Sequence, residues 1–227
     1  MTSSREALAE QLLRTRVGRY VLLVSLVVEI FVIPPLVSMG DLPRWIQAGA
    51  FSVTMVVGLY ALTPRGVMRG IVMCVAASAL VARWVAVGLG ASAVILVQAA
   101  TAGVATASFA AVLLRDAFSK GRFPDRLLAV LLAYILLGAT WAQMYAFLDV
   151  VYPGALHLPG AALTISEFLY FSFVTLTSVG YGDIVPVHPI ARSLAALEAL
   201  VGQIFLVAIV SRFVGVGLAG SRDSAEV

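Results

Sequence analysis

Residues 175–183 of the chain read Thr-Leu-Thr-Ser-Val-Gly-Tyr-Gly-Asp, and the architecture follows from this stretch. It is short, polar and punctuated by two glycines, yet it lies between hydrophobic segments long enough to cross a bilayer. Non-helical backbone cannot face lipid, because unpaired N–H and C=O groups are costly in hydrocarbon. The stretch must therefore be enclosed by protein and line a polar path. Gly180 and Gly182 can adopt a positive φ, which residues with a Cβ resist, so successive carbonyl groups are expected to turn toward one side.

The composition identifies an integral membrane protein. The 227 residues are 61% hydrophobic and 12% charged, whereas a soluble domain carries about 25% charged residues. The single cysteine, Cys74, lies in an apolar run, which excludes a disulfide framework and predicts a buried, inert thiol.

Apolar runs of about 20 residues per crossing predict six transmembrane spans. The first run is too long for the hydrophobic part of a signal peptide and is interpreted as a retained anchor. The predicted fold is an all-α membrane protein with six transmembrane helices plus a short re-entrant helix and the loop of residues 175–183. The spans are placed at 18–39, 45–62, 67–89, 92–114, 126–150 and 190–218.

The positions of the basic residues predict the orientation. Twelve of the 15 Lys and Arg residues fall on the side that holds both termini. Cytoplasmic loops carry the excess of Lys and Arg, so both termini are expected in the cytoplasm of a multi-pass protein of the cell membrane. The net charge of +3 then reflects topology, and no nucleic-acid partner is expected.

Residues 175–183 resemble the signature T-x-T-[ST]-V-G-Y-G-D of tetrameric potassium channels, and the resemblance covers about residues 126–218. Ser178 stands where many members carry Thr, and it keeps the hydroxyl group. The resemblance implies that K⁺ is coordinated by the carbonyls of Ser178, Val179, Gly180 and Tyr181 and by the Ser178 hydroxyl. The implied filter residues are Thr177, Ser178, Val179, Gly180, Tyr181, Gly182 and Asp183.

A short pore helix is expected at 167–175, ahead of the filter. Thr164-x-x-Glu167 fits a capping box, in which each side chain satisfies a free backbone N–H. The resemblance places Tyr170 and Phe171 in an aromatic cuff and Thr175 at the end of the helix as further filter support. Tyr170 is expected either to hydrogen-bond Asp183 or to pack only.

The inner helix carries two residues with open interpretations. Gly202 lies 19 residues past Asp183, where the resembled family has a hinge glycine, but a small residue also permits close helix packing. Glu198 is expected to pack against neighbouring helices or, alternatively, to act on ions. His157 and His188 flank the filter either as proton sensors or as plain loop residues.

Two ionisable residues, Glu29 and Arg83, lie within the first four spans and are predicted to form an intramembrane ion pair, either structural or part of a switch. The alternative is an Arg83 side chain that snorkels toward the membrane interface. The fourth span carries no charged residue, unlike that of the voltage-gated members of the resembled family.

The segment 115–126 is expected to lie at the membrane interface or to be a solvated connector. The predicted parts are a cytoplasmic segment 1–17, a four-helix sensor-like domain 18–114 without gating charges, an interfacial linker 115–125, a pore domain 126–218 and a cytoplasmic tail 219–227.

These observations predict a potassium-selective channel that is weakly sensitive or insensitive to voltage. It is expected to be a homotetramer, because a closed ring needs four filters and the chain supplies one. The alternative is a non-conducting or regulatory subunit of a mixed tetrameric cation channel. No zinc, nucleophile-elbow or phosphate-loop motif occurs, so an enzyme is not expected. The expected partners are K⁺ and membrane lipids. No cofactor is expected, and the residues after 218 are too few for a soluble ligand domain.

Overall fold

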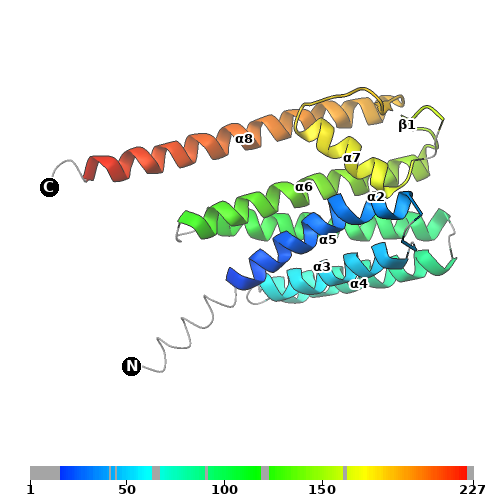
Figure 1. Ribbon diagram of the computed structural model, residues 1–227, viewed down its shortest axis with the longest axis horizontal. Helices are drawn as coiled ribbons and strands as arrows, with labels where there is room; N and C mark the ends of the chain where they lie inside the picture. Colours follow the sequence, from blue (N-terminus) through cyan, green and yellow to red (C-terminus); the bar gives the residue numbers. More distant parts are fainter. Residues whose placement is uncertain are drawn as a thin grey trace.

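The computed structural model describes residues 16–40, 42–43, 45–62, 67–89, 92–118, 123–160 and 163–223. The described chain is almost entirely helical, and its long helices run roughly antiparallel to one another (Figure 1). The first helix begins at residue 16 and continues through η1 (Val28–Val32) and α2 (Ile33–Ser38). The later elements are α3 (Trp45–Ala61), α4 (Val67–Leu89), α5 (Ser92–Ala117), α6 (Phe123–Val151), β1 (Leu156–His157), α7 (Ile165–Leu176), β2 (Val185–Pro186) and α8 (Pro189–Asp223).

Within the described residues, five helical stretches are long and apolar enough to cross a membrane. The all-α membrane fold is thereby confirmed. The helix expected to supply the remaining crossing, α3, has 17 residues, about 26 Å at 1.5 Å per residue, at the lower limit for a span. The sixth crossing stays a prediction. The five stretches are Arg16–Val37, Gly70–Leu89, Ser92–Ala117, Pro124–Val151 and Pro189–Ile209.

The first helix continues past Pro34 and Pro35. Proline lacks an N–H and its ring crowds the carbonyl of the preceding turn. The helix widens into the π-helical turn η1 just before these prolines, and Ile33 N–H bonds to the carbonyl of Val28. The wider turn accommodates the prolines without ending the helix.

The linker is shorter than the predicted 115–125, because α5 continues to Ala117 and α6 begins at Phe123. The inner helix α8 likewise reaches Asp223, beyond the predicted end at 218. Hydropathy marks the lipid-facing part of a helix, and polar turns can extend it at either end. Most of the predicted segment 1–17, the middle of the linker at 119–122 and the end of the tail at 224–227 lie outside the described residues.

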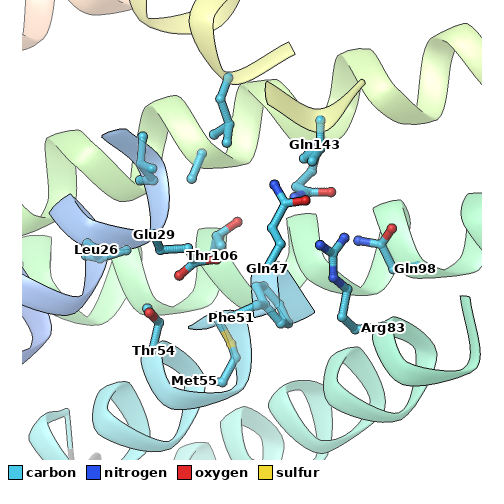
Figure 2. Close-up of a pocket in the computed structure, with 14 residues that line it drawn as sticks. Leu26, Glu29, Gln47, Phe51, Thr54, Met55, Arg83, Gln98, Thr106 and Gln143 are labelled. Carbon is cyan, nitrogen blue, oxygen red and sulfur yellow. The ribbon is translucent and has the colours of Figure 1, made fainter. Parts of the chain in front are cut away.

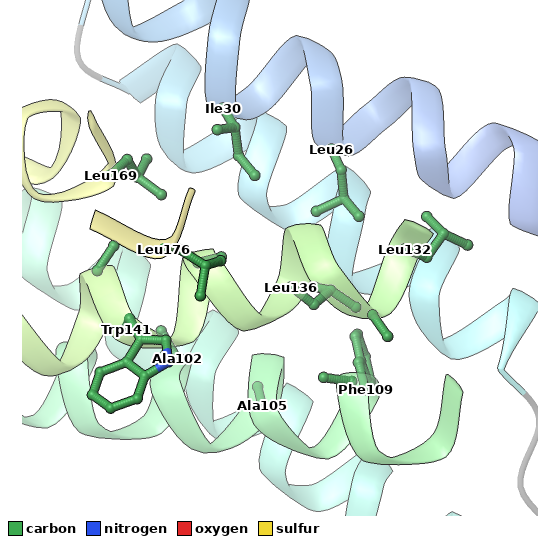
Figure 3. Packing of buried hydrophobic residues seen from close by; sticks show 14 of the residues in the cluster. Leu26, Ile30, Ala102, Ala105, Phe109, Leu132, Leu136, Trp141, Leu169 and Leu176 are labelled. Atoms are coloured by element: carbon green, nitrogen blue, oxygen red, sulfur yellow. The ribbon is translucent and has the colours of Figure 1, made fainter. Parts of the chain in front are cut away.

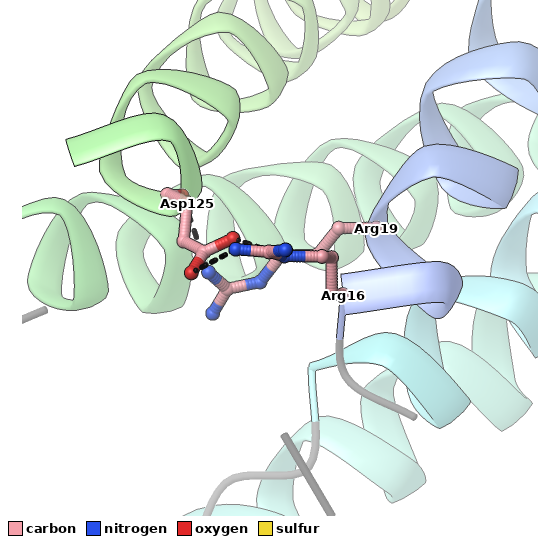
Figure 4. Close-up of polar contacts among 3 residues, drawn as sticks. All are labelled: Arg16, Arg19 and Asp125. Atoms are coloured by element: carbon pink, nitrogen blue, oxygen red, sulfur yellow. Dashed lines mark hydrogen bonds and ion pairs between the residues drawn. The ribbon is translucent and has the colours of Figure 1, made fainter. Parts of the chain in front are cut away.

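A polar cluster ties the first helix to both sides of the linker (Figure 4). Arg16 donates through Nε and Nη2 to the Asp125 carboxylate, at 2.7 and 3.0 Å. Arg19 forms an ion pair with Asp116 at the end of α5. Arg126 Nε donates to the Ala117 carbonyl at 3.0 Å. These arginines therefore bind protein groups.

The core is formed chiefly between α5 and α6, which make the most extensive helix contact in the described chain. Ala102, Ala105 and Phe109 of α5 face Leu132 and Leu136 of α6, all of them buried (Figure 3). Alanines let the two backbones approach closely. The predicted four-helix and pore domains thus share one core.

Cys74, predicted to be buried, is exposed on α4. Apolar sequence around a thiol does not distinguish a lipid-facing helix surface from an interior one.

Candidate functional site

The pore helix α7 begins with the predicted capping box. Thr164 N donates to Glu167 Oε2 at 2.8 Å, and Ser166 N donates to Thr164 Oγ1 at 3.2 Å. The helix ends at Leu176, and the filter loop, residues 177–183, follows immediately. The prediction of a capped, short helix leading into the loop is confirmed.

Positive φ angles recur at every second residue of the filter loop. Ser178, Gly180 and Gly182 have φ of 59°, 59° and 80°, whereas Val179 and Tyr181 are not among the described residues with positive φ. The two glycines were predicted to adopt this conformation. Ser178 was not, and it is the one non-glycine residue in the described chain that does so. Its place two residues before Gly180 is the signal that the sequence offered.

The beginning of the loop folds back on the end of α7. Ser178 N–H donates to the Thr175 carbonyl at 2.9 Å, and Val179 N–H donates to the Val174 carbonyl at 2.9 Å. The Thr177 hydroxyl donates to the Phe173 carbonyl at 2.6 Å. The last turn of the helix therefore sets the direction in which the loop leaves it.

One side of the filter loop is open in the single chain. Val179 and Tyr181 are 53% and 72% exposed. A Cβ built on Gly180 or Gly182 would meet no heavy atom within 4 Å. The chain encloses the loop from one side only, although irregular backbone at membrane depth must be enclosed completely.

The two expected cuff residues have different surroundings. The ring of Tyr170 lies parallel to that of Tyr181, with centroids 6.4 Å apart. Interaction of the Tyr170 hydroxyl with the Asp183 carboxylate, chiefly hydrogen bonding, raises the pKa of Tyr170. Phe171 instead is buried and meets Tyr145 of α6 edge to face, with centroids 5.0 Å apart. Tyr170 therefore braces the loop, and Phe171 packs behind the pore helix.

The inner helix α8 contacts the junction between pore helix and filter loop. Gln203 Nε2 donates to the Ser178 hydroxyl at 2.9 Å. A Cβ added to Gly202 would come 2.0 Å from the carbonyl oxygen of Leu176, the last residue of α7. The structure thus shows close packing at Gly202, which was the alternative interpretation, and a hinge role stays a prediction.

Glu198 lies one turn before Gly202 and is fully buried. Tyr145 Oη donates to Glu198 Oε2 at 2.7 Å, and Ser172 Oγ lies 2.6 Å from Glu198 Oε1. Glu198 therefore connects α8 to α6 and α7, in agreement with the packing interpretation. The sequence indicated Glu198 as an unusual residue in an apolar helix, but not its two partners.

The exit of the filter loop is attached to the end of α6 by contacts that the sequence did not reveal. The strands β1 and β2 are antiparallel and pair His157 with Val185. The Ala155 carbonyl accepts from the N–H groups of Val187 and His188, at 2.9 and 3.1 Å. The imidazole of His188 stacks on Tyr152, with ring centroids 4.4 Å apart. His188 thus has a structural contact, and proton sensing stays a prediction.

Glu29 and Arg83 do not form the predicted direct ion pair, although both line one cavity among the helices (Figure 2). The cavity has a volume of about 40 Å³, enough to admit water. Arg83 Nε and Gln143 Oε1 are buried there without a hydrogen-bond partner among the described residues. The sequence predicted that these two residues would be partners, but not that both would line a cavity.

Comparison with known proteins agrees with this geometry. A family model described as "Ion channel" matches residues 129–217. The two pore potassium channel b of Oryza sativa subsp. japonica is 39% identical over 95 residues, which cover 41% of this chain and 24% of the relative. Protein LctB of Bacillus caldotenax is 48% identical over 50 residues, which cover 22% of this chain and 37% of the relative. No solved structure matches the chain significantly.

Both alignments thus cover well under half of each relative's own length. The family match covers most of α6, which is the outer helix of the resembled family, the pore helix α7, the filter loop and most of the inner helix α8. The chain is therefore a multi-pass membrane protein whose residues 129–217 match an ion-channel family, and over part of its length it is similar to a potassium channel.

Proposed function

We propose that the chain is the subunit of a potassium-selective channel that conducts K⁺ passively across the cell membrane. The observation that carries the proposal is the filter loop, with positive φ at Ser178, Gly180 and Gly182 and one open side. Alternation of positive and negative φ turns successive carbonyl groups toward the same side. A row of such carbonyls can replace the hydration shell of K⁺.

The pore helix supports cation binding through its direction. Its C-terminal end leads directly into the filter loop, and aligned peptide dipoles place about half a negative charge at such an end. The proposed K⁺ ligands are the carbonyls of Ser178, Val179, Gly180 and Tyr181 together with the Ser178 hydroxyl. Thr177 and Gly182 complete the loop, and Asp183 raises the local cation concentration at its exit.

We infer that four identical chains surround one pore. Each chain supplies one filter loop, and the open side of that loop needs further protein to enclose it. The inner helix has an apolar exposed face that suits contact with neighbouring subunits or lipid. The exposed side chains of this face include Leu197, Leu200, Ile204, Leu206 and Val207.

The proposed topology has six crossings with both termini in the cytoplasm. The first helix begins, and α8 ends, on the same side of the molecule, opposite the filter loop (Figure 1). The short helix α3 would be the second crossing. The helices before α6 are proposed to be a scaffold for the pore, because α5 makes the most extensive helix contact of the described chain with α6.

Reconstitution in liposomes tests the proposal. Purified protein should carry K⁺ down its gradient and exclude Na⁺. Tyr181→Asp should lose this discrimination while the oligomer persists, because it alters the filter and leaves the helices unchanged. Val53→Ala, at a 57% exposed position on α3, is the control that should behave like the parent protein.

The oligomeric state decides between the two candidate assemblies. A homotetramer that conducts supports the proposed channel. A purified protein that forms no homotetramer and carries no ion would contradict it and favour a subunit that needs a different partner chain. Equal flux of Na⁺ and K⁺ would contradict the proposed selectivity.

A further inference from the structure

Glu198 is a buried acid at the junction of three helices behind the filter loop. Its relative exposure is 0%. Among the described residues no Arg, Lys or His forms an ion pair with it. Its side chain meets only hydroxyl groups in the hydrogen bonds that the structure describes, those of Tyr145 on α6 and Ser172 on α7.

The oxygen atoms around Glu198 allow its proton to be located by counting. Tyr145 Oη lies 2.7 Å from Glu198 Oε2, and Ser172 Oγ lies 2.6 Å from Glu198 Oε1. Ser172 Oγ also lies 2.8 Å from the Gly138 carbonyl oxygen, which can only accept. Each of these three oxygen–oxygen contacts needs one proton. The two hydroxyl groups supply two protons, so the third must belong to Glu198.

A neutral Glu198 satisfies every member of this network. Its Oε1–H donates to Ser172 Oγ, Ser172 donates to the Gly138 carbonyl, and Tyr145 donates to Oε2. An ionised Glu198 would leave one close pair of oxygen atoms without a proton between them. It would also place an unpaired charge in an apolar interior, which is far more costly than a hydrogen-bonded neutral acid.

We propose that Glu198 is a neutral carboxylic acid in the working protein and a positioning residue that holds the inner helix against the pore helix and outer helix. Its effect on ion flux rests on the function proposed above. Ser172 lies on α7, six residues before the filter residue Ser178. Loss of the contact between Glu198 and Ser172 therefore detaches α8 from the helix that leads into the filter loop.

The attachment of α8 through Glu198 should weaken in one direction of pH only. The titratable groups facing Glu198 are the phenols of Tyr145 and Tyr134, both on α6. From α7 the facing group is the Ser172 hydroxyl, which does not titrate in this range. Removal of the Glu198 proton at alkaline pH leaves two protons for three contacts, so the attachment weakens as pH rises.

Infrared spectroscopy tests the protonation directly and does not depend on ion conduction. At neutral pH the parent protein should show a carbonyl-stretch band of a protonated carboxylic acid that Glu198→Gln lacks. Tyr145→Phe should shift this band to higher frequency, because it removes the hydrogen bond to Oε2. Asp149→Asn, which changes an acid outside the network at the end of α6, should leave the band unchanged. A spectrum in which the parent protein and Glu198→Gln share all such bands would overturn the assignment, and the Tyr145→Phe shift decides it if Glu198→Gln fails to fold.

Potassium flux from liposomes tests the positioning role. The flux of the parent protein should fall severalfold between neutral and alkaline pH. Glu198→Gln should retain its flux over this range, because its amide reproduces the donor and acceptor of the neutral acid. Flux that falls equally in both proteins would refute the positioning role. A parent protein without any flux would contradict the proposed channel function, while the infrared result would still decide the state of Glu198.

Discussion

Gly202 has no room for a methyl group, because a Cβ there would lie 2.0 Å from the Leu176 carbonyl oxygen. We therefore expect Gly202→Ala to push α8 away from the end of α7 and to destabilise the protein by about 1–3 kcal/mol. Thermal unfolding of the purified protein in detergent measures the effect. Gly49→Ala is the matched control, since a Cβ at Gly49 meets nothing within 4 Å. If both variants unfold at the parent temperature, close packing is not what requires glycine at 202.

Ser178 combines an unusual backbone conformation with a hydroxyl that Gln203 contacts at 2.9 Å. If this hydroxyl is a K⁺ ligand, Ser178→Ala should weaken K⁺ binding about tenfold, the equivalent of about 1.4 kcal/mol for one lost polar contact. Calorimetric titration with K⁺ measures the affinity. Ser108→Ala is the control, because the Ser108 hydroxyl bonds to the Val104 carbonyl of its own helix. Unchanged affinity in Ser178→Ala would remove this hydroxyl from the proposed site.

The sequence predicted the conformation of single residues only where chemistry restricts it. Glycine tolerates positive φ, so Gly180 and Gly182 were foreseen. Ser178 adopts the same conformation in the hydrogen-bonded turn that ends α7, where Ser178 and Val179 donate to the carbonyls of Thr175 and Val174, and its residue type does not reveal this. The partners of Glu198 and Gln203 were missed because spacing within one helix does not reveal which side chains the neighbouring helices present.

At the scale of elements, the first helix is joined to the linker region by charged groups. Asp125 receives two hydrogen bonds from Arg16, and the two side chains are 31% and 33% exposed. Because such partly exposed pairs contribute little, Asp125→Asn should lower the free energy of unfolding by about 1 kcal/mol or less. Unfolding at low and high salt should show the effect shrink as salt screens the charges.

Arg115→Gln is the control for this comparison, because Arg115 is exposed at the end of α5 that adjoins the linker. The two variants should differ at low salt and converge at high salt. A loss in Asp125→Asn that is unaffected by salt would show that packing, and not charge, holds the first helix there.

Elements were predicted well where apolar runs are long, and poorly where helices depend on their neighbours. The helix α4 matches the predicted 67–89, whereas residues at both ends of the predicted linker belong to the helices α5 and α6. Glu29 and Arg83 show the other limit. Rise along a helix gives the depth of each charge, but rotation about the axis and the side chains of α3 determine whether charges on separate helices touch.

At the scale of the whole molecule, the four-helix part does not stand apart from the pore. Buried residues of α5 and α6 belong to one cluster that extends from the first helix to the start of α8. A part that shares its core with the pore can transmit force to it, but it responds to voltage only if it also carries charge through the field. The response to voltage therefore depends on which charges lie within the bilayer.

The fourth span contains no charged residue between Ser92 and Leu114, and Arg115 follows only at its end. One elementary charge moved through the full field contributes about 2.3 kcal/mol per 100 mV. Because α5 carries no charge within the span, the membrane potential does little work on it when it moves. Glu29 and Arg83 have opposite signs and line the same cavity, so a shared displacement moves no net charge. We expect conductance in symmetric K⁺ to change little with voltage, and Arg83→Gln to leave that dependence weak. A conductance–voltage curve that rises as a steep sigmoid would require several moving charges per subunit and would contradict the scaffold role proposed for these helices.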